Sequence, residues 1–501
     1  MPRLTRRRLL RQVGGAAAAI PAAGAATELF SAAPSDGGGQ SASPDAQSGG
    51  PGDVTGRLAR YMVSARDREL PAQVVRDAKH RMLDTLAAMV SGAELPPGLA
   101  AIRYIRSQGG TAEASVLTTN LRTTAVNAAL VNGMFAHADE TDDFEPVTKA
   151  HPGSAVVPAA LAMAEKDRRS GTELLRAVVL GYDVCCRFLM ALGPDHVRAT
   201  HRSAEGTSAT FGATAAAASM ARLDERGMRF ALSYGAQQVS GLWSWTRDED
   251  HIEKAFDFAG MGARNGVAAA TMVHSGFTGV AEVLDGEHNM ILALSSQPRP
   301  EEMVKDLGTR FYVSESAIKV FSVGYPIQSA LDALLALRRE HMLTPDTVAK
   351  IVVRLPEDGA RIVDGNAMPD VNLQHLVAVA LIDGTVSFEM SHSRERMKDP
   401  RVLAVKAKVQ LVGDRALVDP TAPRSGAVEA TLADGRVVRH FTRHPPGTKE
   451  NPLSAEAVAT KARDLMSPVI GAARADAVIS RVNRIEELRD ARDLVRLMRR
   501  S

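Results

Sequence analysis

The densest group of chemically useful side chains is an acidic cluster at residues 137–143, HADETDD. It holds four carboxylates within five residues and follows an apolar helical pattern over residues 123–137. Carboxylates this close repel one another, which raises the pKa of some of them and suits general acid–base chemistry or cation binding. The alternative is a solvated acidic loop with no chemical role. The pattern of an EF-hand calcium loop is absent from it.

Four further side chains could exchange protons or bind anions. His151 follows the acidic cluster, and His201 precedes a predicted helix. A histidine titrates near neutral pH and can act as a base, although a single histidine is more often a surface or capping residue. Lys254 and Lys319 each adjoin an apolar segment, where a lysine can bind a carboxylate or simply extend toward solvent. His196 and His201 are five residues apart, which does not match the HExxH zinc motif.

Composition excludes several classes of protein. The 501 residues, 45% hydrophobic and 24% charged, indicate a globular protein of two or three domains. A formal net charge of +2 gives no electrostatic case for binding nucleic acid. The two cysteines, Cys185 and Cys186, are adjacent, so we expect neither a disulfide framework nor a cysteine-based metal site. The glycines of residues 260–266, GMGARNG, follow no predicted strand and indicate close helix packing rather than a dinucleotide loop.

The first 53 residues predict an export signal and a linker. Arg6, Arg7 and Arg8 precede a weakly apolar run at residues 13–26 and then small residues, the order of a twin-arginine signal. The apolar run is too short for an ordinary membrane span. We expect residues 1–33 to be a cleaved signal peptide and residues 34–53 to be a flexible linker. The expected location is periplasmic or extracellular, with no stable membrane insertion. The alternative to an export signal is a basic N-terminal tail without a targeting role.

The elements that must position these side chains are mostly helical. In the clearest helix, apolar residues recur at spacings of three and four between Pro71 and Gly92: Val75, Ala78, Met82, Leu86 and Met89. After Lys319 the pattern changes to a helix at residues 327–339, strands at 350–355 and 405–411, and a hairpin around Asp434 and Gly435. The predicted fold class is mainly α: a large all-helical domain (54–318), to which residues 444–501 return, with a smaller inserted α+β lid domain (319–443).

Five stretches, in order, resemble the MmgE/PrpD family, which includes 2-methylcitrate dehydratase, cis-aconitate decarboxylase and related epimerases. They are residues 132–158, 181–212, 254–286, 318–333 and 373–384. The resemblance implies a helical domain with an α+β lid, a homodimer, and an active site between the domains without metal or other cofactor. It places the catalytic set on seven residues: Glu140, Asp142, His151, His201, Lys254, Lys319 and His375.

The resemblance also implies roles for these residues. His151 or His201 would carry a proton at a carbon next to a carboxylate, and Lys254 and Lys319 would bind carboxylates. Glu140 or Asp142 would orient a histidine or act as the partner acid–base group.

The sequence departs from the family pattern at four positions. Glu140 stands where Asp is most frequent, Phe144 where Thr is frequent, Arg202 where Pro is usual, and His375 where some members have Tyr. These departures fall on substrate-reading positions, and predicted export also separates this chain from the cytoplasmic methylcitrate cycle.

The predicted function is therefore an exported, cofactor-independent lyase, a dehydratase or a decarboxylase, acting on a small di- or tricarboxylic acid. One alternative is an isomerase or epimerase that uses the same proton abstraction. The other is a non-catalytic exported protein that binds carboxylates. In each case we expect a homodimer, no metal and no nucleic-acid partner.

Overall fold

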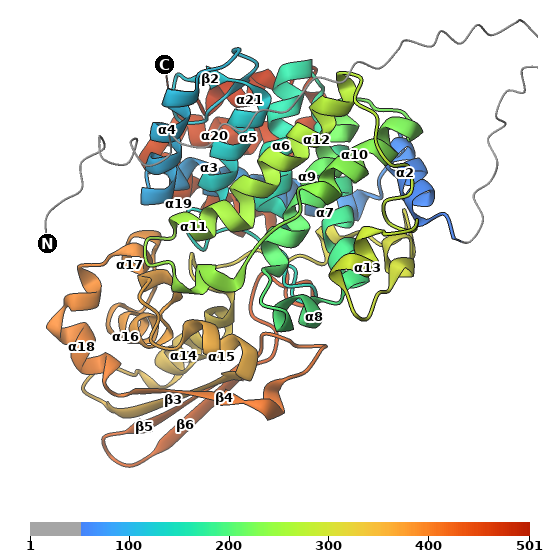
Figure 1. The fold of residues 1–501 in the computed structure, drawn as a ribbon. Coiled ribbons are helices and arrows are strands. Elements are labelled where there is room, and N and C mark those ends of the chain that lie inside the picture. The colour runs from blue at the N-terminus through green and yellow to red at the C-terminus, as the bar shows by residue number, and fades with distance from the viewer. Residues whose placement is uncertain (1–51, 501) are drawn as a thin grey trace, which may run out of the picture. The chain divides into compact units, whose positions relative to one another are not determined.

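The computed structural model describes residues 52–500, all within the unit Gly49–Ser501. The predicted signal peptide (1–33) and residues 34–51 of the predicted linker lie outside the described residues. Most of the elements are helices, and the strands form two small sheets, which confirms the mainly α fold class (Figure 1).

The larger hydrophobic core joins residues between Val54 and Ile318 with residues from Val458 to Met498, and we call this part the helical lobe. Its helices are α2 (Val54–Ser64), α3 (Ala72–Gly92), α4 (Pro96–Gln108), α5 (Ala125–Ala136), α6 (Pro152–Asp167), α7 (Gly171–Leu192), α8 (Pro194–Ala199), α9 (Ala204–Met220), α10 (Glu225–Gln237), α11 (Ile252–Ala255), α12 (Met261–His274), α13 (Met290–Leu294), α19 (Ala455–Ile470), α20 (Ala472–Asn483) and α21 (Arg492–Leu497). A two-stranded sheet, β1 (Ala114–Ser115) with β2 (Arg122–Thr123), completes it.

Small residues let the central helices approach closely. A Cβ atom added to Gly262 would lie 2.4 Å from Ala209 Cβ, and one added to Gly266 would lie 2.4 Å from Ala213 C. Side chains at these positions of α12 would therefore collide with α9. The GMGARNG segment serves close helix packing, as its sequence predicts.

The C-terminal helices pack on the N-terminal part of the helical lobe. Helices α19 and α20 contact α3, and α21 contacts α6. Helix α3 begins after Pro71 and ends at Gly92, as predicted, and its Met82, Leu86 and Met89 are fully buried. Apolar helices that bury most of their surface in this way derive their stability from packing rather than from local propensity.

The second core lies between Val323 and Val438, and we call this part the mixed lobe. Its sheet has the order β4 (Val409–Asp414), β3 (Val348–Pro356), β5 (Gly426–Leu432), β6 (Val437–Thr442), with β3 and β4 parallel and the other pairs antiparallel. Its helices are α14 (Gln328–His341), α15 (Glu357–Val363), α16 (Leu373–Asp383), α17 (Phe388–His392) and α18 (Pro400–Lys406). Buried and half-buried residues alternate along β5, so one face of the sheet meets the helices (Figure 1).

One predicted strand is wrong in part. The expected strand at 405–411 begins only at Val409, because Val405 and Lys406 end helix α18. Asp399 caps this helix by accepting from the Arg401 amide, and Pro400 fills its first position, which fixes a helix start there. The predicted hairpin around Asp434 and Gly435 is confirmed by the pairing of β5 with β6.

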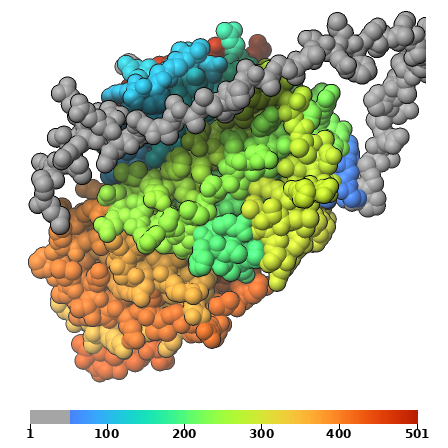
Figure 2. All heavy atoms as spheres, in the orientation of Figure 1, coloured from blue at the N-terminus to red at the C-terminus, as the bar shows by residue number. Residues whose placement is uncertain are grey.

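The two lobes touch directly, as the space-filling view also shows (Figure 2). Arg394 of the mixed lobe contacts the Glu249 carbonyl and lies 3.4 Å from Asp250 of the helical lobe. Among residues 52–500, no individual helix is both long enough and apolar enough to cross a membrane. Helices α3 and α4 together meet both requirements, but the chain bends by 76° between them.

Candidate active site

The acidic cluster is buried, which excludes the solvated-loop alternative. It follows α5, whose C-cap is His137, and every residue from His137 to Phe144 is inaccessible or nearly so. Burying carboxylates is costly unless cations or hydrogen bonds compensate them. The partners of the cluster therefore define the site.

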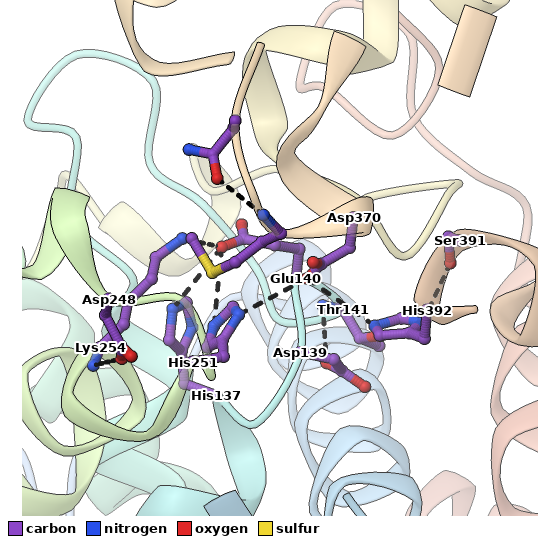
Figure 3. Close-up of polar contacts among 12 residues, drawn as sticks. His137, Asp139, Glu140, Thr141, Asp248, His251, Lys254, Asp370, Ser391 and His392 are labelled. Carbon is purple, nitrogen blue, oxygen red and sulfur yellow. Dashed lines mark hydrogen bonds and ion pairs between the residues drawn. The ribbon is translucent and has the colours of Figure 1, made fainter. Parts of the chain in front are cut away.

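Two lysines hold Glu140. Lys254 Nζ contacts Glu140 Oε1 (Figure 3). Lys319 Nζ lies 3.1 Å from Glu140 Oε2. Burial alone would raise the pKa of Glu140, but the ammonium groups of Lys254 and Lys319 outweigh it and hold that pKa well below its usual range. Burial would lower the pKa of Lys319, but Glu140 and Asp142 raise it. Glu140 is therefore a carboxylate and Lys319 an ammonium ion.

Local structure brings each lysine to the cluster. Lys254 lies in the short helix α11, whose chain runs on through a π-helical turn (Phe256–Gly260) into α12. Such π-helical turns occur often at functional sites. Lys319 follows Ala317, which forms two backbone hydrogen bonds with Phe144 at 2.7 and 3.0 Å. This bridge fixes the Lys319 segment beside the end of the cluster.

Asp142 lies between two histidines. Its Oδ2 is 3.0 Å from His151 Nδ1, and its Oδ1 is 2.9 Å from His137 Nδ1. Burial would raise the pKa of Asp142, but His137, His151 and Lys319 hold it well below its usual range. A carboxylate can only accept hydrogen bonds, so His151 donates from Nδ1 and its Nε2 is free to take or give a proton.

Burial sets the charge of the remaining cluster groups. It lowers the pKa of His137 to about 4, so this ring, which stacks on Phe258 at 4.3 Å, is neutral near pH 7. It raises the pKa of Asp139 to about 6, and burial together with Asp142 raises that of Asp143 to about 7. The pKa values of Asp139 and Asp143 are raised, as the sequence predicts, but burial rather than repulsion between carboxylates is the largest cause.

Three site residues were not predicted from the sequence. His251, just before α11, lies 3.8 Å from Glu140 Oε1 through Nε2 and 3.5 Å from Asp370 Oδ2 through Nδ1. His392 Nε2 lies 3.8 Å from the same Asp370 oxygen (Figure 3). Burial would raise the pKa of Asp370, but His251 and His392 lower it. The polar run Asp248–His251 before Lys254 could have indicated His251; Asp370 and His392 carry no such signal.

Two predicted residues lie outside this cluster. His201 follows α8, and its side chain is exposed. Its backbone has a φ of 61° and forms hydrogen bonds with the backbones of Arg198 and Trp243. His375 is buried in α16 of the mixed lobe, and neither ring nitrogen has a hydrogen-bond partner among residues 52–500. Burial, then Lys406 and Arg396, lowers the pKa of His375 to about 4. The structure therefore brings together Glu140, Asp142, His151, Lys254 and Lys319, without His201 and His375.

A cleft of about 910 Å³ is lined by residues of both lobes. Arg198, Trp243 and Trp245 of the helical lobe line it, and so do Asp358 and Arg361 of the mixed lobe. The Trp245 ring also lies 4.9 Å from Lys254 Nζ. Trp245 therefore contacts both the cleft and Lys254 of the buried cluster.

The sequence matches the MmgE/PrpD N-terminal domain over residues 56–303 and the MmgE/PrpD C-terminal domain over residues 321–486. It is 25% identical over 484 residues to the cis-aconitate decarboxylase-like protein oryM of Aspergillus oryzae, covering 89% of this chain and 97% of the relative. It is 23% identical to the cis-aconitate decarboxylase of Aspergillus terreus (92% and 98% covered) and 24% identical to that of Mus musculus (89% and 93% covered). With both domains matched in order over most of its length, the chain belongs to the MmgE/PrpD family.

Proposed function

We propose that this chain is a lyase that removes carbon dioxide or water from a small di- or tricarboxylic acid, with decarboxylation of an acid of the cis-aconitate type as its first candidate reaction. One observation carries the proposal: a buried Asp142–His151 pair lies beside the lysine-bound carboxylate of Glu140. The names of the relatives supply the reaction class and the type of acid.

The Asp142–His151 pair supplies the proton chemistry. Asp142 fixes the His151 ring through Nδ1, so Nε2 can hold a proton for the substrate or accept one from it. In a decarboxylation, the electrons of the broken C–CO₂ bond remain on carbon, and His151 delivers the proton that completes the new C–H bond. In a dehydration, His151 removes a C–H proton, and a second acid protonates the departing hydroxyl.

The lysines supply the electrostatics. Lys254 and Lys319 already hold one carboxylate, Glu140, and all three side chains are buried. A substrate carboxylate can take over part of this contact, and ammonium groups in a dry site stabilise the charge that builds up in the transition state. This arrangement suits a reaction that needs no metal or organic cofactor, which is part of the proposal.

Phe144 favours a substrate without a hydroxyl group at this wall of the site. Its ring lies 5.2 Å from the His151 ring and stacks on Tyr325 at 4.3 Å. The Phe144 ring itself offers a substrate hydroxyl no hydrogen-bond partner, which weakly disfavours such a substrate. We therefore favour an unsaturated acid over a hydroxy acid. Export through the twin-arginine signal and assembly as a homodimer remain parts of the proposal, based on the sequence pattern and on the resemblance.

The proposal is tested by incubating the purified protein with cis-aconitate, citrate, 2-methylcitrate, malate and tartrate, and measuring carbon dioxide and organic products. We expect turnover of at least one acid and its loss in Lys254→Met. The matched control is Lys398→Met, which removes an exposed lysine of the mixed lobe. Turnover that survives Lys254→Met, or its absence on every acid in a folded protein, would count against the proposed function.

A further inference from the structure

We propose that His137, Glu140 and His251 form a binding site for one divalent transition-metal ion, with Zn²⁺ as the best fit. Both histidines direct Nε2 at the same carboxylate oxygen: the distances to Glu140 Oε1 are 4.0 Å from His137 and 3.8 Å from His251. One donor atom from each residue lies within 4.8 Å of the other two. Two imidazoles and a carboxylate, with a position left for water, are a common donor set for Zn²⁺.

Both rings are oriented as metal-binding histidines usually are. His137 Nδ1 lies 2.9 Å from Asp142 Oδ1, and His251 Nδ1 lies 3.5 Å from Asp370 Oδ2. A carboxylate near the far nitrogen favours this orientation of the ring and leaves the lone pair of Nε2 for the ion. Figure 3 shows the two rings side by side, pointing toward Glu140.

The donor atoms also lack other partners. Nε2 of His137 and Nε2 of His251 are buried, and neither has a hydrogen-bond partner among residues 52–500. A buried polar atom without a partner is costly, and a bound ion would satisfy both nitrogens at once. Ligand atoms around tetrahedral Zn²⁺ lie about 3.4 Å apart, so each histidine needs to move closer to Glu140 by about half an ångström.

Lys254 competes with the ion, because its Nζ contacts the same oxygen, Oε1 of Glu140. Nζ already lies 4.9 and 5.2 Å from the ring centres of Trp245 and Phe258, so both rings continue to attract the ammonium group when the ion displaces it from Oε1. Lys319 contacts the other oxygen, Oε2, and can stay. The ion and Lys254 are thus alternative partners of Glu140, so the ion inhibits any reaction that needs Lys254 in place; this consequence alone rests on the proposed function.

The test uses the full chain after treatment with a chelator, titrated with Zn²⁺ by calorimetry and with Co²⁺ by visible absorption. We expect one equivalent of each ion to bind, with the absorption of four-coordinate Co²⁺, and Zn²⁺ to raise the unfolding temperature. His251→Gln should weaken binding at least about tenfold, and Asp370→Asn should weaken it about 10- to 100-fold through the orientation of His251. His274→Gln, which removes an exposed histidine of α12, is the matched control.

Binding of no ion at one equivalent, or binding unchanged in both His251→Gln and Asp370→Asn, would overturn the site. Equal weakening in His274→Gln would also overturn it, because the ion would then be bound elsewhere. None of these measurements needs turnover, so failure of the proposed lyase activity leaves this test intact.

Discussion

Oδ2 of Asp142 lies 3.0 Å from Nδ1 of His151, and neither side chain is more than 5% exposed. Asp142 also meets His137 and Lys319, which hold it in its charged form. The pair therefore has a fixed tautomer and a fixed direction, and several predictions about chemistry and stability rest on it.

Replacing Asp142 with Asn should reduce kcat about 10²- to 10⁴-fold with a small change in KM. The amide no longer favours the His151 tautomer that leaves Nε2 free, while the shape of the site is kept. Steady-state kinetics on whichever acid is turned over measures the effect, with thermal unfolding to confirm folding. A large rise in KM at unchanged kcat would show that Asp142 binds substrate instead.

Lys319→Met should destabilise the fold by about 3–5 kcal/mol, because it removes the buried lysine beside Asp142 and one of the two lysines that hold Glu140. Adding Glu140→Gln should recover part of that loss by removing one of the uncompensated charges. Denaturant unfolding of the two single variants and the double variant gives the coupling energy. If the double variant loses the sum of the two single losses, the buried Lys319–Glu140 contact carries no stability.

Asp143 should make stability depend on pH. Burial and Asp142 raise its pKa from 3.8 to about 7 in the folded chain, so the folded state binds a proton more tightly than the unfolded state. Its contribution to stability is therefore fully present below about pH 4 and is lost as the pH rises to about 7. Asp143→Asn stays neutral and should lack this loss.

The measurement is the free energy of unfolding of Asp143→Asn minus that of the unmodified chain, taken at a series of pH values. It should grow in favour of the variant between about pH 4 and 7 and level off above. A flat difference across this range would mean that Asp143 does not titrate as described.

Arg6→Lys combined with Arg7→Lys should retain the precursor in the cytoplasm, because the twin-arginine route requires the arginine pair. Fractionation of cells followed by immunoblotting measures the location. Arg57→Lys, an arginine of α2 outside the predicted signal, is the matched control. Export that is unchanged by the double substitution would contradict the predicted signal.

Much of the site could be predicted because its residues stand in distinctive local patterns. The acidic run containing Glu140 and Asp142, His151 nine residues after Asp142, and the isolated Lys254 and Lys319 all marked positions that the fold brings together. His251 and Asp370 could not be paired in this way, since they lie in different lobes and are more than a hundred residues apart in the sequence. Position alone also gave no sign that the side chain of His201 would be exposed and that of His375 buried in the mixed lobe.

In the fold, too, features set by local sequence could be predicted and others could not. Helix α3 and the β5–β6 hairpin follow from punctuation by proline and glycine, which acts locally. The strand predicted at 405–411 begins too early because the prediction rested on period-two alternation across Val405 and Lys406. In the structure these two residues end the helix that starts at Asp399 and Pro400. Capping residues are the stronger signal there, since they fix backbone geometry directly.

The central claim is that His151 delivers or removes the proton at a carbon next to a carboxylate. The most direct test is proton NMR of the full chain with cis-aconitate in deuterium oxide, beside His151→Gln and the control His274→Gln. We predict a product with one carboxyl group fewer and one deuterium on a carbon next to a remaining carboxylate, formed by the unmodified chain and by His274→Gln but not by His151→Gln. The same deuterated product formed at an unchanged rate by His151→Gln would contradict the account.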